Sequence, residues 1–139
     1  TTMDELMEQL KIDPIPDRLL PTVQFGGPVE MHRGFVLHSA DWEAEGGTLE
    51  VDDEISMTGT LDVLREMAEG GGPRVAMLAL GYAGWGPGQL EAEIARNGWL
   101  TADGAGRIIF DLPNAEKWEA ALALLGVDPL FLSSEAGRA

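Results

Sequence analysis

One segment of this chain joins a strand to a helix through a glycine-rich turn, and it constrains the fold more than any other. The apolar run 75–80 is typical of a strand buried on both faces of a sheet. The run 89–97 has a helical period, and glycines stand between the two at positions 81, 84, 86 and 88. Glycines this dense allow positive φ angles or close backbone contact. The segment predicts a tight packing joint that needs Gly84 and Gly86 for its backbone geometry, with Pro87 in the first helical turn.

The same turn lacks the residues of a nucleotide-binding loop. A P-loop has lysine and then serine or threonine after its last glycine, where this chain has Pro87 and Gly88. A dinucleotide fingerprint needs a third glycine at the position of Gln89. Two interpretations of the turn remain. It is a packing joint with Trp85 in the core, or it is a ligand or partner site whose rim is formed by Tyr82, Trp85 and Gln89.

The remaining elements alternate in type along the chain. Thr2 is a good cap for a helix up to about residue 11, and Thr60 and Asn114 are good caps for helices over 61–69 and 114–125. Trp118 lies on the predicted core face of the last helix. Strands are predicted at 23–25, 33–39, 48–51 and 55–58, and a further pair at 99–101 and 107–111. This pattern predicts an α+β fold in a single domain.

The charge of the chain restricts its partners. Twenty-four acidic residues against nine basic ones give a formal net charge of −15. Direct nucleic-acid binding is disfavoured, because its affinity depends on lysine and arginine at the phosphates. Binding to an anionic membrane is disfavoured for the same reason, and no apolar run approaches the ~20 residues that span a bilayer. The absence of cysteine excludes disulfides and thiolate metal sites, and it agrees with a reducing cytoplasm.

Three segments together resemble the signature of the YqgE/AlgH family of small bacterial proteins. They are 25–29 (Phe-Gly-Gly-Pro-Val), 33–39 (Arg-Gly-Phe-Val-Leu-His-Ser) and 80–91, and the agreement extends from Leu6 to the C-terminus. The resemblance implies one domain over residues 1–139, built on a strongly bent, partly barrel-like mixed sheet with helices around it. Family members usually carry a few dozen residues before the position of Thr1, so we expect this chain to lack the strands which that segment supplies.

No catalytic motif is complete in the sequence. There is no Gly-x-Ser-x-Gly elbow, and the two histidines, His32 and His38, do not have the spacing of a helical metal pair. We therefore predict no metal site. Arg33 precedes an apolar strand and is predicted to form a buried bidentate pair with a carboxylate such as Glu91. The residues that remain as candidates for ligand or partner binding are Arg33, His38, Tyr82, Trp85, Gln89 and Glu91.

These observations favour a cytoplasmic, non-enzymatic binding or regulatory protein without a cofactor, whose partner is a protein or a small molecule. The resemblance carries a suggested role in transcriptional regulation. Because the charge argues against contact with DNA, we expect any such role to be indirect. The alternative is an enzyme or small-molecule binder that uses a cleft formed by the six candidate residues.

Overall fold

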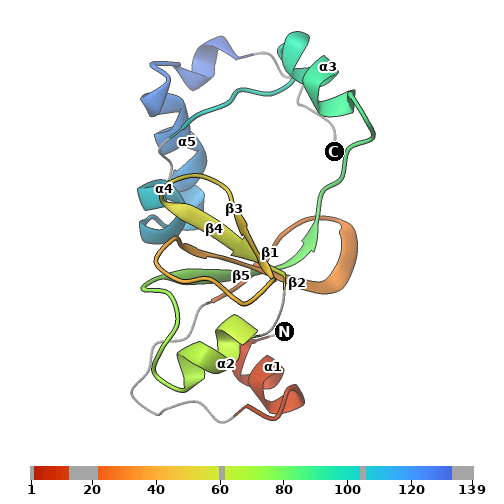
Figure 1. Ribbon diagram of the computed structural model, residues 1–139. Helices are drawn as coiled ribbons and strands as arrows, with labels where there is room; N and C mark the ends of the chain where they lie inside the picture. The colour runs from red at the N-terminus through yellow and green to blue at the C-terminus, as the bar shows by residue number, and fades with distance from the viewer. Residues whose placement is uncertain (1, 13–21, 60–61, 104–105, 133–139) are drawn as a thin grey trace. The chain divides into compact units, whose positions relative to one another are not determined.

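The computed structural model describes residues 2–12, 22–59, 62–103 and 106–132. The chain forms two compact units, residues 1–82 and 83–139, and each is described by itself. The first unit holds a five-stranded mixed sheet and two helices, and helices form the second (Figure 1). The predicted α+β class and the mixed sheet are confirmed.

The sheet runs in the order β1-β5-β2-β4-β3 and is open rather than closed into a barrel. Its strands are β1 (Val23–Phe25), β2 (Val29–Ser39), β3 (Thr48–Glu50), β4 (Ile55–Thr58) and β5 (Ala76–Tyr82). β5 pairs in parallel with β1 and antiparallel with β2, while β4 pairs antiparallel with both β2 and β3. The predicted β3–β4 hairpin is confirmed. Its turn is held by Asp52 Oδ1, which accepts from the N–H groups of Glu54 and Ile55.

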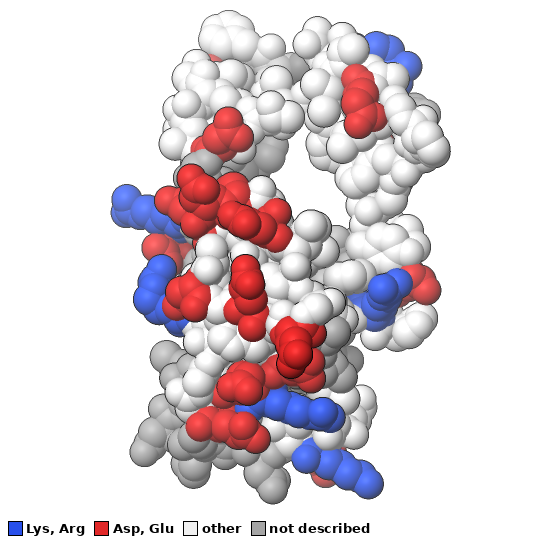
Figure 2. Space-filling model, in the orientation of Figure 1, with Lys and Arg blue, Asp and Glu red and all other residues white. Residues whose placement is uncertain are grey.

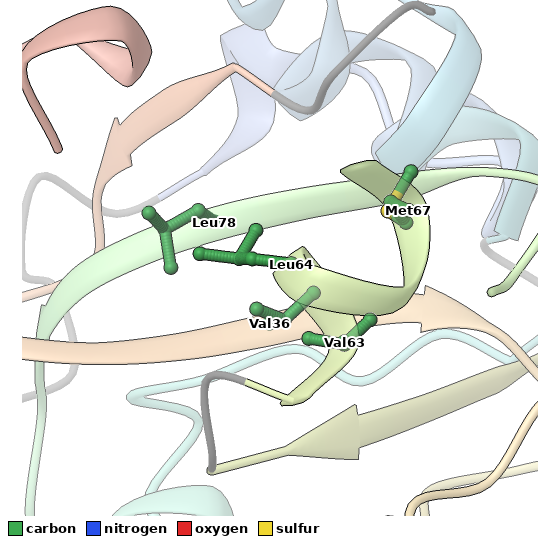
Figure 3. Packing of buried hydrophobic residues seen from close by; sticks show 5 residues of the cluster. All are labelled: Val36, Val63, Leu64, Met67 and Leu78. Carbon is green, nitrogen blue, oxygen red and sulfur yellow. The ribbon is translucent and has the colours of Figure 1, made fainter. Parts of the chain in front are cut away.

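Helices α1 (Met3–Gln9) and α2 (Asp62–Ala68) belong to this sheet unit and supply its core. α1 begins with a capping box, in which the Glu5 N–H donates to Thr2 Oγ1 and the Thr2 N–H donates to the Glu5 carboxylate. The predicted cap of α2, Thr60, lies outside the described residues. The buried core joins α2 to strands β2 and β5, as Figure 3 shows for Val36, Val63, Leu64, Met67 and Leu78.

The opposite face of the sheet is also apolar. The strand register places Leu49, Met57, Leu37 and Met77 in one row across β3, β4, β2 and β5. Because side chains alternate between faces along a strand, this row faces away from the core residues Val36 and Leu78. The row is half-buried on three strands and exposed at its β3 end.

The close backbone contact predicted for the glycine-rich segment is made by Gly81 rather than by Gly84 or Gly86. Gly81 has a φ of +80°, and a Cβ atom there would lie 2.3 Å from the carbonyl oxygen of Gly27. Gly81 therefore cannot carry a side chain without moving the backbone. A Cβ at Gly86 would meet only Gln89 Oε1, at 3.8 Å, and the other left-handed glycine of the turn is Gly88. The prediction for Gly84 and Gly86 is wrong, because proximity of glycines in sequence does not say which one meets another strand.

The second unit consists of α3 (Gln89–Ala95), α4 (Gly106–Asp111), α5 (Asn114–Leu124) and the 3₁₀ turn η1 (Pro129–Phe131). Gly88 is the N-cap of α3, so Pro87 lies outside the helix rather than in its first turn. Pro113 is the N-cap of α5, so Asn114 is its first residue rather than its cap.

Two other predictions for the second unit are wrong. The predicted strand pair is absent, because 99–101 is not a strand and 106–111 is the helix α4, since the type of a short apolar run cannot be settled by periodicity. Trp118 is 60% exposed and is not part of the described core. Among the described residues, no helix is both long and apolar enough to cross a membrane.

A hydrogen-bonded clasp joins the end of β2 to the start of β5. Ser39 Oγ donates to Asp41 Oδ1 at 2.6 Å and accepts from the Val75 N–H at 3.1 Å, and the Arg74 N–H donates to Asp41 Oδ2 at 3.1 Å. The Ser39 hydroxyl, followed by the backbone N–H of Arg74, holds the pKa of the Asp41 carboxyl below its usual value.

The clasp predicts loss of stability in acid. The pKa of Asp41 is lower in the folded protein than in the unfolded chain, where it is about 4. The ionised Asp41 carboxylate therefore stabilises the fold fully above that unfolded pKa, and this stabilisation is lost as the pH falls through the folded pKa. We expect urea melts to show a smaller loss of unfolding free energy between about pH 6 and about pH 3 for Asp41→Asn than for the wild type. Equal losses would contradict this assignment.

Candidate functional site

His38 is a structural residue rather than a site residue. It is fully buried on β2, and both ring nitrogens are engaged. Nδ1 lies 2.8 Å from the Ser39 carbonyl oxygen, which only accepts, so Nδ1–H donates, and in the tautomer with its hydrogen on Nδ1 the Nε2 atom accepts from Thr58 Oγ1 at 2.7 Å. Thr48 Oγ1 then donates to Thr58 at 2.8 Å and accepts from the Ala44 N–H. This relay crosses β3, β4 and β2 and leaves His38 unavailable to a ligand.

Breaking the relay tests this role. We expect Thr58→Val, which keeps the shape and removes the hydroxyl, to lower the unfolding free energy by about 1–3 kcal/mol, because the buried His38 Nε2 loses its donor. Exposed Thr101→Val should change it by no more than about 0.5 kcal/mol. The measurement is a urea melt of each variant. A neutral Thr58→Val would mean that the relay does not stabilise the sheet.

Arg33 and Tyr82 are brought together by a residue that was not among the candidates, Glu30. Tyr82 Oη donates to Glu30 Oε2 at 2.7 Å, and Arg33 Nη1 lies 3.6 Å from the same oxygen. Phe35 lies between them, edge-on to Tyr82 and under the Arg33 guanidinium at 5.1 Å from its ring centre. Arg33 is exposed, so the predicted buried bidentate pair with Glu91 is wrong. Glu30 and Arg33 stand at i and i+3 on the same strand, so β2 itself supplies the acidic partner.

The backbone at Glu30 is unusual for an exposed residue. Its φ is +42°, in the region that side chains other than glycine seldom adopt, and the β2–β5 register shifts between Val29 and Gly34. The Glu30 carboxylate at this bulge accepts from Tyr82 Oη. Strained non-glycine conformations cluster at active sites, ligand clamps and switch regions.

Tyr82 is the only tyrosine in the chain, so its titration can be followed by the ultraviolet absorbance of the phenolate. Its pKa is raised above the usual value, chiefly because its hydroxyl donates to Glu30, and Arg33 acts in the opposite direction. We expect Glu30→Ala to lower this pKa toward about 10 and Arg33→Ala to raise it further. Shifts in the same direction for both variants would contradict the arrangement.

Trp85 and Gln89 are brought together by another residue outside the candidate set, Glu93. This carboxylate is buried on α3, and its Oε2 accepts from Trp85 Nε1 at 3.3 Å and from Trp99 Nε1 at 2.6 Å. Its Oε1 accepts from Gln89 Nε2 at 3.0 Å. The two indole rings meet edge to face, with centres 5.9 Å apart. The Glu93 carboxylate thus connects the glycine-rich turn, α3 and the loop after α3 by hydrogen bonds.

Glu91, the carboxylate predicted on this helix, is exposed. The 3.6-residue period places residue 93 one turn from Gln89, whereas residue 91 lies on another side of the helix. The spacing of Gln89 and Glu93 at i and i+4 was therefore the signal that sequence reasoning missed.

The candidate residues do not form a single site within either unit. Arg33 and Tyr82 meet in the sheet unit, Trp85 and Gln89 meet in the helical unit, and His38 and Glu91 join neither pair. Within the described parts of the chain, no three histidine, aspartate or glutamate side chains are placed to hold a metal ion. The hydroxyl of Tyr82 and the amide of Gln89 both make internal hydrogen bonds, to Glu30 and to Glu93.

The comparison with known families agrees with the resemblance that residues 25–29, 33–39 and 80–91 carry. A family model described as AlgH-like matches residues 1–130. The chain belongs to the AlgH-like family. Its sheet and helices match the solution structure of the AlgH protein from Pseudomonas aeruginosa with a TM-score of 0.71 and 43% sequence identity, covering 100% of this chain and 74% of that one.

Relatives of this AlgH-like chain occur in bacteria. It is 57% identical over 139 residues to a UPF0301 protein of Jannaschia sp. (strain CCS1), covering 99% of this chain and 72% of that protein. It is 53% identical over 137 residues to a UPF0301 protein of Paracoccus denitrificans (strain Pd 1222), covering 97% of this chain and 72% of the relative. The AlgH-like chain thus spans just under three quarters of the length of these proteins.

Proposed function

We propose that this protein is a non-enzymatic, cytoplasmic binding protein that regulates a protein partner. The proposal rests on one surface of the sheet unit, around the bulge of β2 and its crossing with Gly81. We call it the bulge surface, and it consists of Val29, Glu30, Met31, Arg33 and Tyr82. Val29 is 38% exposed and Met31 57% exposed, and they flank the left-handed Glu30 along β2.

The composition of the bulge surface is that of a protein contact. Aromatic, methionine and arginine side chains are enriched at protein interfaces. The Glu30–Arg33–Tyr82 contacts hold the polar groups in place, so little side-chain freedom would be lost on binding. A regulatory role through such a partner is compatible with the net charge of −15, whereas direct contact with DNA is not.

The test is photo-crosslinking in cells with a benzophenone side chain at position 29 or 31, and at exposed position 100 as the control. We expect positions 29 and 31 to trap the same partner and position 100 not to trap it. The purified partner should then bind Val29→Ser/Met31→Ser at least about tenfold more weakly than wild type. Equal binding by the double variant would overturn the assignment of the bulge surface.

Small-molecule binding is the competing function, because Arg33 and Tyr82 belong to this surface. A thermal-shift screen with metabolites separates the two, since a ligand that binds only the native state raises stability by RT ln(1 + [L]/Kd). A metabolite that raises the midpoint in wild type but not in Arg33→Ala would favour a small-molecule binder. Salt-sensitive DNA binding in a gel-shift assay would contradict the indirect regulatory role.

A further inference from the structure

Among the described residues, β3 is one of the two edge strands of the sheet, opposite β1. Half of its backbone groups point away from the sheet. The Val51 N–H donates to the Ile55 carbonyl, and the Gly59 N–H donates to the Gly47 carbonyl, so odd-numbered residues face β4. Backbone groups alternate in direction along an antiparallel strand. The N–H and C=O groups of Thr48 and Glu50 are therefore directed outward, where the backbone of an added strand can hydrogen-bond with them.

The side chains of this edge continue an apolar face. Leu49 is 59% exposed and Val51 55% exposed, and both lie on the face that carries the row Leu49, Met57, Leu37 and Met77. A strand added beside β3 would extend this row with its own apolar side chains at every second position.

The negative charge around β3 indicates a positively charged partner. Residues 34–64 contain no lysine or arginine. The β3–β4 hairpin and the loop before it carry the carboxylates Glu43, Glu45, Glu50, Asp52, Asp53 and Glu54, all at least partly exposed. Acidic side chains dominate the face shown in Figure 2, where β3 and β4 lie in Figure 1. A second copy of this edge would place like charges opposite one another, which is unfavourable.

We infer that the β3 edge binds an extended cationic peptide segment, in which apolar side chains alternate with lysine or arginine. The backbone of the segment pairs with the outward groups of Thr48 and Glu50. Its apolar side chains pack beside Leu49 and Val51, and its cations meet the hairpin carboxylates. This inference is independent of the bulge surface, because it uses none of its residues.

The test uses the full chain and labelled eight-residue peptides in fluorescence anisotropy. We expect alternating Lys-Val to bind, and alternating Glu-Val and Lys-Ser to bind at least about tenfold more weakly. An N-methylated Lys-Val peptide keeps the charge and side chains but loses backbone donors, so it should also bind about tenfold more weakly. Equal binding of the methylated peptide would overturn strand addition.

Protein variants locate the contact. Glu50→Lys and Leu49→Ser should each weaken Lys-Val binding, whereas Glu8→Lys on α1 makes the same charge change and should weaken it much less. In amide hydrogen exchange, the peptide should protect the N–H groups of Thr48 and Glu50. Equal weakening by Glu8→Lys, absence of this protection, or no binding of Lys-Val at all would each overturn the proposal. Val29→Ser/Met31→Ser should leave the peptide affinity unchanged, so the two proposals fail separately.

Discussion

Gly81→Ala is expected to lower the unfolding free energy by about 3 kcal/mol or more, one of the two largest losses among the variants considered. Two effects combine at this position. The left-handed φ of +80° disfavours any side chain, and the new Cβ would lie 2.3 Å from the Gly27 carbonyl oxygen. The two backbone segments cannot move apart easily to make room for the Cβ, because the Gly26 N–H, next to Gly27, donates to the carbonyl of Leu80, next to Gly81, at 2.8 Å.

Gly46→Ala is the matched control. Gly46 lies in the same unit with a φ of +75°, but a Cβ there would meet nothing within 4 Å. Its substitution should therefore cost only the backbone strain, about 1–2 kcal/mol. Urea melts of the two variants measure the steric part by difference. Equal losses would show that the crossing relaxes to admit a methyl group.

Glu93→Ala is expected to destabilise the helical unit by about 2–4 kcal/mol, the second large effect. It removes the acceptor of the indole N–H groups of Trp85 and Trp99 and of the Gln89 amide. A hydrogen bond to a charged group contributes about 1.5–3 kcal/mol, and the half-buried Trp85 and Trp99 each lose one, whereas the exposed Gln89 amide can bind water instead. Tryptophan fluorescence during urea unfolding follows the change, since both rings lie at the broken contacts.

Glu91→Ala is the control on the same helix. Glu91 is exposed, so its removal should change the unfolding free energy by no more than about 0.5 kcal/mol. Comparable losses for Glu91→Ala and Glu93→Ala would mean that the two indole contacts do not stabilise the unit.

Local patterns predicted those elements whose stabilising contacts lie within a few residues. The helix capped by Thr2 and the β3–β4 hairpin follow from short spacings in the sequence. By contrast, the stretch 106–111 has the composition of a strand and forms a helix, because a run of six residues does not determine its own partners.

The amino-acid sequence by itself determined the α+β class, the family signature, the acidic charge and the presence of a glycine-constrained crossing. Only the tertiary structure decided which glycine makes that crossing and that His38 is buried and hydrogen-bonded to a threonine. It also decided that Glu30 and Glu93, rather than Glu91, form hydrogen bonds with the candidate side chains. The physical reason is distance along the chain. Gly27 and Gly81, or Thr58 and His38, meet only when strands far apart in sequence are paired in register, and no local pattern encodes that register.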